Sequence, residues 1–315
     1  MSRHPSGMNG WRGALGGVRW GLLASLLLGA AAQSAIAGEE AAPAVLRLGF
    51  SASVFVGVNE NDAKASMKVW TQAILAEHSV SVSEELQVLD GDKAIARAVR
   101  DASVDALTLT ALEFGALGGQ WMSSNTVVGI NGGVATDEYL LLARADNGAK
   151  NLSELRGRTV IFFQNPRTCL APIWFETILL EAGLGTTPQF CGRVIQVSKL
   201  SQSVLPVFFH QADACVVTRR GFETMVELNP QVGRQLKTVA CSPPMVPVVF
   251  GFRAAYLGAA KDQIEAKIRG VNTTPAGRQV LTLFQCESLE VRPASVLKSS
   301  MDLLAAHGRL VAGRP

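Results

Sequence analysis

Two kinds of segment alternate along the chain from residue 46 to residue 252. Mostly apolar runs of four to six residues, typical of buried strands, lie at 46–50, 85–89, 105–110, 159–163, 194–197, 213–217, 236–240 and 248–252. Between several of these runs, apolar residues recur every three or four positions, as Ala63, Met67, Trp70 and Ile74 do, which is typical of one helix face. Strands alternating with helices predict parallel sheets that are covered by helices on both faces.

The alternation occurs twice, which predicts an α/β fold with two lobes. Two stretches between the units differ from them: residues 126–144 are extended and contain glycine, and residues 241–247 are rich in proline. We predict that these stretches are two hinge crossings. The first lobe then comprises residues 38–134 plus 243–315 and the second lobe residues 135–242, each a mainly parallel sheet flanked by helices. Three helices at 263–269, 275–284 and 294–307 are expected to pack on the first lobe.

The N-terminal segment has the pattern of an export signal. Arg3, Arg12 and Arg19 precede or flank an apolar run at 21–32, the small residues Ser-Ala-Ile-Ala occupy 34–37, and no acidic residue occurs before position 39. This pattern predicts a secretory signal peptide over residues 1–37, cleaved after Ala37, and a mature chain in the periplasm. An uncleaved anchor helix is the alternative, although the apolar run is short for about 30 Å of hydrocarbon.

Charge argues against one class of partner. The chain has 29 Lys and Arg against 26 Asp and Glu, and removal of residues 1–37 takes away three arginines, which leaves 26 of each sign. Because no positive field then remains to neutralise phosphate groups, nucleic acid is not an expected partner. No second long apolar segment follows, so we expect no membrane insertion after cleavage.

The cysteine spacing matches no metal motif, and only three histidines follow residue 37. We therefore expect no metal site and no cofactor. The periplasm permits one or two disulfides, which the sequence does not rank, and the alternative is that most of the thiols are free and buried. The five cysteines are Cys169, Cys191, Cys215, Cys241 and Cys286.

The residues that follow the predicted strands carry the candidate chemistry. In an open α/β sheet, ligands bind outside the carboxyl ends of the strands, where helix N-termini present free N–H groups. Arginine together with hydroxyls and helix amides is suited to a phosphate, phosphonate or carboxylate group. The pattern therefore predicts an anion-binding cleft between the lobes, formed by Ser51, Ser53, Thr110, Arg167, Thr168, Cys169, Thr218 and Arg219.

These side chains also have simpler interpretations. Arg167 and at least one of Arg219 and Arg220 are compatible with surface side chains that point to solvent. Thr168 is a typical N-cap, and Ser51 and Ser53 are typical turn residues. Cys169 at a helix start has the position of a reactive thiol, but no histidine stands in a recognisable signature with it. An enzyme that uses Cys169 is therefore a competing hypothesis, and a structural envelope protein with an empty cleft is a third.

Four segments, in order, resemble one family. Asn-Leu-Ser-Glu-Leu-Arg-Gly-Arg-Thr-Val-Ile-Phe at 151–162 resembles the Leu-x-x-Leu-Lys-Gly-Lys segment of the periplasmic phosphate/phosphonate-binding proteins of ABC transporters. Asp-Ala-Cys-Val-Val at 213–217 is similar to their Asp-Ala-Ala strand, and Cys-Ser-Pro-Pro-Met-Val-Pro at 241–247 to their Ser-Pro-Pro return crossing. Val-Leu-Thr-Leu-Phe-Gln at 280–285 is similar to a segment of their C-terminal helices.

The resemblance implies a type 2 periplasmic binding fold and a receptor without catalysis of its own. Such a receptor closes on a small anion, namely phosphate, phosphonate or a related oxyanion, and presents it to an ABC permease. A ligand-sensing subunit for a histidine kinase or cyclase is the alternative. We expect a monomer, which is the usual state of such receptors.

The family also implies roles for the candidate residues. Its phosphonate binders hold the anion on a Ser-Thr-Ser-Gly run at a helix N-terminus, where this chain has Arg167, Thr168, Cys169 and Leu170. We expect Arg167 to pair with the anion and Thr168 to cap it. Thr218 or Arg219 would close from the same lobe, and the side chains expected to close from the other lobe are Ser51, Ser53 and Thr110.

Overall fold

The computed structural model describes residues 45–55, 59–75, 83, 86–118, 121–146, 148–258 and 260–313. The predicted signal peptide lies outside these residues. Residues 43–315 belong to one compact unit. In the part of the chain that the structure describes, no helix has the length and apolar character needed to cross a membrane.

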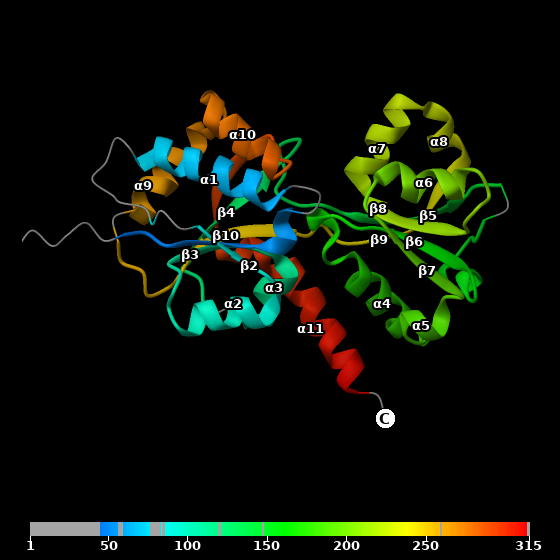
Figure 1. The fold of residues 1–315 in the computed structure, drawn as a ribbon. Coiled ribbons are helices and arrows are strands. Elements are labelled where there is room, and N and C mark those ends of the chain that lie inside the picture. Colours follow the sequence, from blue (N-terminus) through cyan, green and yellow to red (C-terminus); the bar gives the residue numbers. More distant parts are fainter. Residues whose placement is uncertain are drawn as a thin grey trace, which may run out of the picture. The chain divides into compact units, whose positions relative to one another are not determined.

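The first lobe is built on a six-stranded sheet (Figure 1). β1 pairs in parallel with β2 and β3, whereas β10 and β11 run antiparallel to their neighbours. The sheet is therefore mixed rather than mainly parallel, because β10 returns from the second lobe and inserts between β3 and β4. In spatial order the strands are β11 (Ser288–Pro293), β4 (Asn125–Ile130), β10 (Val248–Phe252), β3 (Ala106–Thr110), β1 (Leu48–Ser51) and β2 (Gln87–Leu89).

The second lobe is built on a five-stranded sheet, which is also mixed. β6 pairs in parallel with β7 and β8, and β5, which enters from the first lobe, runs antiparallel to β8 and β9. The spatial order is β7 (Arg193–Val197), β6 (Thr159–Phe163), β8 (Ala214–Thr218), β5 (Tyr139–Arg144) and β9 (Leu236–Cys241).

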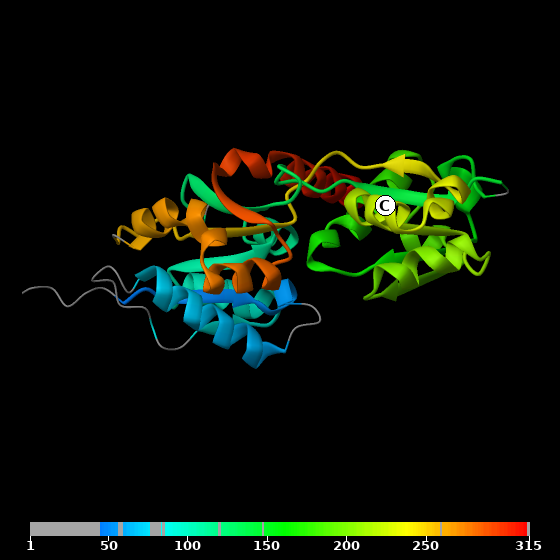
Figure 2. The same ribbon diagram turned by 90° about the horizontal axis from the view of Figure 1, so that it is seen from above.

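Helices cover both faces of each sheet, as predicted (Figures 1 and 2). In the first lobe, one core lies beneath α1 (Glu60–Leu75), α9 (Ala260–Lys267) and α10 (Pro275–Leu283), and the other beneath α2 (Gly91–Arg100) and α3 (Ala111–Ala116). In the second lobe, α4 (Ala171–Glu181) and α5 (Thr187–Phe190) cover one face, and α6 (Leu200–Phe208), α7 (Arg219–Leu228) and α8 (Pro230–Gln235) cover the other. β3 and β8 are buried at every position because they are central strands with both faces covered.

Short 3-10 turns complete the connections. They are η1 (Ala52–Phe55), η2 (Leu152–Leu155), η3 (Pro166–Thr168), η4 (Ile268–Thr273) and η5 (Ala294–Leu297). η3 separates β6 from α4, so the predicted helix after Asn165 begins with a 3-10 turn and continues as α4 at Ala171.

The two crossings lie side by side. Asp137 and Met245 form an antiparallel bridge, in which the N–H of each donates to the C=O of the other at 2.8 and 2.9 Å. The Tyr139 N–H donates to the buried Ser242 hydroxyl at 2.8 Å. The chain thus passes between the lobes through two hydrogen-bonded segments, which is the paired arrangement that the sequence predicted. The residues at which each lobe begins and ends, 134/135 and 242/243, stay predictions.

The last helix differs from the prediction. α9 and α10 pack on the first lobe as expected, but α11 (Lys298–Ala312) contacts both α3 and α4. Gly115 of α3 allows the close approach, because a Cβ there would lie 2.2 Å from Leu304 Cδ1. Nε2 of His307 lies 3.2 Å from Oε1 of Glu176 on α4. Only the beginning of α11 therefore packs on the first lobe, and its later turns lie against the second.

Candidate functional site

The predicted hydroxyls of the first lobe bind a carboxylate of the same lobe. Ser51 ends β1, Thr110 ends β3, and both are buried. The Ser51 hydroxyl donates to Oε1 of Glu113 at 2.5 Å, and the N–H and hydroxyl of Thr110 donate to Oε2 at 2.9 and 2.8 Å. Ser53 is exposed, and its N–H donates to the Ser51 hydroxyl at 3.0 Å. The Glu113 carboxyl thus accepts from both buried hydroxyls, and the contact of Ser51, Ser53 and Thr110 with a ligand stays a prediction.

The predicted threonines of the second lobe bond to backbone groups of their own turns. The Thr168 hydroxyl accepts from the Asn165 N–H at 2.9 Å and donates to the Phe163 carbonyl at 2.7 Å. The Thr218 hydroxyl accepts from the Gly221 N–H at 3.1 Å. Thr218 is thus the N-cap of α7, whereas Thr168 is the third residue of a capping box whose N-cap is Asn165. The contact of either hydroxyl with a ligand stays a prediction.

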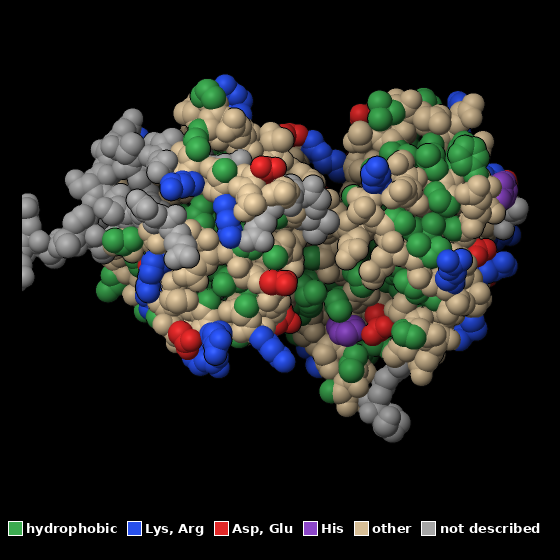
Figure 3. All heavy atoms as spheres, viewed as in Figure 1, with side chains coloured by type: hydrophobic (Ala, Val, Ile, Leu, Met, Phe, Trp, Pro, Cys, Tyr) green, Lys and Arg blue, Asp and Glu red, His purple; other side chains and the backbone are tan. Residues whose placement is uncertain are grey.

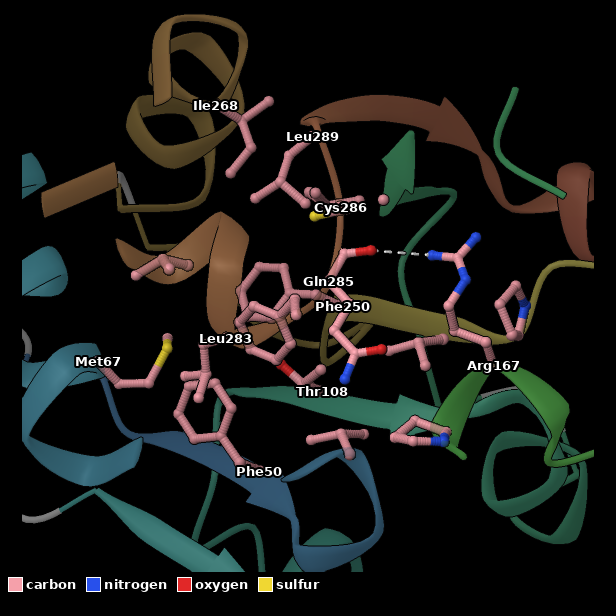
Figure 4. A pocket seen from close by; sticks show the side chains of 18 of the residues that line it. Phe50, Met67, Thr108, Arg167, Phe250, Ile268, Leu283, Gln285, Cys286 and Leu289 are labelled. Atoms are coloured by element: carbon pink, nitrogen blue, oxygen red, sulfur yellow. Dashed lines mark hydrogen bonds between the residues drawn. The ribbon is translucent and has the colours of Figure 1, made fainter. Parts of the chain in front are cut away.

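Arg167 lies where the two lobes and the first crossing meet. Its Nη2 lies 2.6 Å from Oδ2 of Asp137 on that crossing, and the two side chains are 16% and 4% exposed. Its Nη1 donates to the carbonyl of Gln285, which follows α10 of the first lobe, at 3.4 Å (Figure 4). The guanidinium is therefore largely withdrawn from water, which corrects the alternative that it points to solvent.

The carboxylate beside Arg167 is incompletely paired. Burial raises the pKa of the Asp137 carboxyl, and the attraction of Arg167 and Arg220 lowers it by less. Among the described residues, none makes an aligned hydrogen bond to Oδ2, although Arg167 is within ion-pair distance. The two side chains therefore form a close ion pair that lacks an aligned hydrogen bond to Oδ2.

The next two arginines also meet acids. Arg219 pairs through Nε with Glu138, and its Nη2 lies 3.2 Å from the Cys241 sulfur. Arg220 pairs with Glu287, which precedes β11 in the first lobe. Figure 3 likewise shows Lys and Arg interspersed with Asp and Glu on the face that it draws. The positive charge suggested by the arginines after the strands is thus balanced locally.

Cys169 is a buried thiol. Its Sγ donates to the Pro247 carbonyl at 3.3 Å. Burial raises the pKa of this thiol to about 12, and the backbone N–H groups of Leu112 and Ala111 facing the sulfur offset the effect only in part. The thiol is therefore protonated at neutral pH, which argues against its use as a nucleophile. All five cysteines are free, and the described residues contain no cluster of His, Cys, Asp and Glu that fits a metal ion.

Four residues of the site were not among the predicted ones: Glu113, Asp137, Glu138 and Gln285. Thr110 and Glu113 have the spacing of a capping box, which is a readable signal. Asp137 and Glu138 are adjacent acids in a largely apolar crossing, a weaker signal. The sequence contains no signal for the position of the Gln285 carbonyl, because that position depends on a backbone φ of +52°, which is rare for a residue other than glycine.

A cavity of about 70 Å³ lies below Arg167, inside the first lobe. Arg167 and Gln285 lie at one end, and the side chains toward the other end include Phe50, Met67 and Leu283 (Figure 4). Asn165 also lines the cavity and donates to the side chain of Gln285. The cavity lies between the sheet and the helices α1, α9 and α10, and more of the residues that line it come from the sheet than from these helices. Of the eight predicted ligand residues, Arg167 is the one that lines this cavity.

The shared fold is illustrated by three solved structures, each with a TM-score above 0.5. An ATP-bound protein from Xanthomonas citri has a TM-score of 0.61 at 16% identity and covers 86% of this chain and 99% of its own. A binding protein component of an ABC phosphonate transporter from Pseudomonas aeruginosa has a TM-score of 0.56 at 16% identity, covering 85% and 88%. PhnD1 of Prochlorococcus marinus, in complex with methylphosphonate, has a TM-score of 0.54 at 15% identity, covering 86% and 99%.

The comparison with curated proteins gave no match. Because their identity to this chain is low, the solved structures support the fold alone. This fold is the predicted two-lobed α/β architecture of periplasmic binding proteins. A family model described as ABC transporter, phosphonate, periplasmic substrate-binding protein matches residues 71–295, well over half of the chain. The chain therefore belongs to the family of periplasmic substrate-binding proteins of ABC phosphonate transporters.

Proposed function

We propose that this chain is a periplasmic receptor that closes on a small anion beside Arg167 and delivers it to an ABC permease. The observation that carries the proposal is the position of the Arg167 guanidinium, which contacts the first crossing and the carbonyl of Gln285 from the other lobe. A ligand held there touches both lobes, so its binding energy favours the arrangement in which they approach each other.

The anion is proposed to replace Asp137 as the partner of Arg167. A guanidinium presents a planar set of donors that suits the oxygens of a phosphonate, sulfonate or carboxylate. Asp137 is attached to the crossing and makes no aligned hydrogen bond through Oδ2 to any described residue. A bidentate ligand therefore offers Arg167 better hydrogen bonds than the carboxylate that it displaces.

Binding is testable with simple anions. We expect phosphate, methylphosphonate, methanesulfonate or acetate to raise the unfolding temperature, since a ligand at 100 times its Kd adds about 2.7 kcal/mol of stability. Arg167→Gln removes the donor and should weaken binding at least tenfold, as titration calorimetry would measure. Arg193→Gln removes an exposed arginine on β7 and serves as the matched control. An absence of binding to every anion, or full binding by the Arg167 variant, contradicts the proposal.

Export and partner choice are parts of the same proposal. We propose cleavage after Ala37 and a monomeric mature chain, which N-terminal sequencing and light scattering of periplasmic protein would test. The family membership favours the permease over a sensor kinase or cyclase as the partner. An enzymatic role for Cys169 is not proposed, because its thiol has a raised pKa and donates to a backbone carbonyl.

A further inference from the structure

The cavity below Arg167 has walls that do not suit a small, fully polar anion. Leu48, Phe50 and Phe250 line it from the sheet, and Met67, Val280 and Leu283 line it from the helices. Thr108 adds a hydroxyl to this otherwise apolar wall (Figure 4). An inorganic oxyanion that moved inside would lose its water and gain almost no hydrogen bonds.

The cavity is also poorly suited to water. A volume of about 70 Å³ exceeds the roughly 10–15 Å³ that one water needs, but an ordered water also requires two to four polar partners. Protein interiors are packed with few voids of this size, and apolar voids destabilise the fold. An apolar group is the occupant that fits the wall.

The mouth of the cavity is polar and is held under strain. Gln285 has a φ of +52°, and its carbonyl accepts from Arg167 Nη1 at 3.4 Å and from Asn131 Nδ2 at 3.2 Å. Its side-chain oxygen accepts from Asn165 Nδ2 at 3.3 Å. Strained backbone that is held by hydrogen bonds from three residues of two other segments is typical of ligand sites. The polar groups therefore stand at the entrance of an apolar space.

We propose that the ligand is an amphipathic anion, whose charged head binds Arg167 and whose short aliphatic tail enters the cavity of the first lobe. The proposal rests on the proposed function, because it uses Arg167 as the anion contact, and it adds the substrate class. Arg167 and the apolar wall lie in the same cavity, so one small molecule reaches both.

The volume limits the tail. The cavity is about half the size of the roughly 150 Å³ apolar cavity that admits benzene. A tail of a few carbons fits without rearrangement, and an aromatic ring does not. Each methylene that moves from water to the apolar wall tightens binding about fourfold.

The test is a calorimetric series of alkylphosphonates on the wild-type mature chain: methyl-, ethyl-, propyl-, butyl-, octyl- and phenylphosphonate. We expect Kd to fall about 15-fold from methyl to propyl, which adds two methylenes. The gain should end near butyl, and phenylphosphonate should bind no better than the methyl compound. A matched series of carboxylates, from acetate to octanoate, tests whether the tail effect is independent of the head.

Two variants that narrow the cavity and one surface control test whether the tail lies in this cavity. Leu283→Phe narrows the cavity from α10 and should remove the gain in affinity from methyl- to propylphosphonate, measured as the ratio of the two Kd values within this variant. Val127→Leu narrows it from β4 and provides a second variant if the first does not fold. Leu228→Phe makes the same change as the first variant on α7, at a side chain that is 83% exposed, and should keep the full gain.

The outcomes separate the two proposals. Equal affinity for all chain lengths in the wild-type protein overturns the tail but leaves the anion receptor intact. Failure of the whole series, methylphosphonate included, with failure of the carboxylates overturns both. A full chain-length gain that survives in both folded cavity variants overturns the assignment of the tail to this cavity.

Discussion

Two buried aspartates face arginines in this molecule, and they are held in opposite ways. Asp105 of the first lobe is 5% exposed, and its carboxylate accepts from the N–H, Nε and Nη2 of Arg47 and from Nη2 of Arg253, at 2.8–3.2 Å. Asp137 on the crossing is 4% exposed, but Arg167 is its single ion-pair partner among the described residues. Asp105 therefore has more aligned hydrogen bonds than Asp137, although both side chains are hardly exposed.

The pKa shifts follow this difference. Burial raises the pKa of both carboxyls, but at Asp105 the hydrogen bonds from Arg47 and Arg253 outweigh it, so that the pKa is lowered overall. At Asp137 burial outweighs the attraction of Arg167, and the pKa is raised. A fully satisfied carboxylate fixes the fold where it lies. A buried carboxylate that is incompletely satisfied holds its arginine less firmly, which is the property on which the proposed exchange with a ligand anion depends.

The largest loss of folding stability is expected from Asp105→Asn. It leaves Arg47 and Arg253 without their carboxylate inside the first lobe, and breaking such a pair costs on the order of 3 kcal/mol. Urea unfolding of the variant against the wild type measures this loss. Asp101→Asn, at a side chain that is 55% exposed, should cost far less. Similar losses in the two variants would mean that Asp105 is not the structural anchor inferred here.

The loss should depend on pH in a defined direction. Because the pKa of Asp105 is lowered in the folded state, its contribution is complete above the unfolded value of about 3.9. It declines as pH falls through the lower, folded value. The stability curves of the wild type and the Asn variant should therefore converge in acid below about pH 4 and stay parallel above about pH 5.

A smaller loss is expected from Arg167→Gln. Removal of one partner from a buried pair is costly, but the Asp137 pKa is already raised, so this carboxyl takes up a proton instead of remaining as a buried charge. We expect a loss of about 1–2 kcal/mol at neutral pH, below that of Asp105→Asn. Urea unfolding again gives the measurement, and a loss above that of the Asp105 variant would reverse the comparison of the two aspartates.

Asp137→Asn extends the comparison of the two aspartates to the pH dependence of stability and of ligand affinity. Since the folded pKa of Asp137 is raised, the stability tied to its neutral form is complete below about pH 3.9 and lost as pH rises through the folded value. The same protonation frees Arg167 for a ligand. Methanesulfonate keeps its charge throughout, so its affinity should rise as pH falls toward the Asp137 pKa, by at most about tenfold per pH unit.

The Asn variant should bind methanesulfonate with an affinity that changes little over this range. Calorimetric titrations at a series of pH values in both proteins make the measurement. A wild-type affinity that is constant with pH, or a variant that follows the wild type, would show that Asp137 does not compete with the ligand.

The elements were more predictable from the sequence than the site. β6 has the predicted bounds, because five consecutive apolar or β-branched residues between polar turns define a buried strand. β11 was not predicted, since Leu289 and Val291 alternate with Glu290 and Arg292 on an edge strand that is only half buried. The amphipathic pattern of α11 predicts a helix, but it contains no information on which lobe the helix contacts.

The site depends on side chains that packing brings together from distant segments. The sequence singled out Arg167 by its place after a strand, yet its contacts with Asp137 and Gln285 follow from how the crossings and α10 fold back. The hydroxyls of Ser51 and Thr110 were predicted at the correct strand ends, but their common partner Glu113 gives that end a negative charge. The local sequence shows that a residue follows a strand. The sign of the charge at that strand end depends instead on side chains that the fold brings there from other segments.

The smallest loss of folding stability is expected from a substitution in the exposed ion pair that also joins the lobes. Arg220 and Glu287 are 46% and 56% exposed, so water and salt screen their attraction, in contrast to the buried Arg167 and Asp137. Arg220→Gln should change the unfolding midpoint less than Arg167→Gln at low salt, and the change should disappear at high salt. The effect of Arg167→Gln should persist in the same high salt, because little solvent reaches that pair. Equal salt dependence of the two variants would mean that burial does not distinguish these contacts, and Arg167 would then have no advantage over Arg220 as the anion partner.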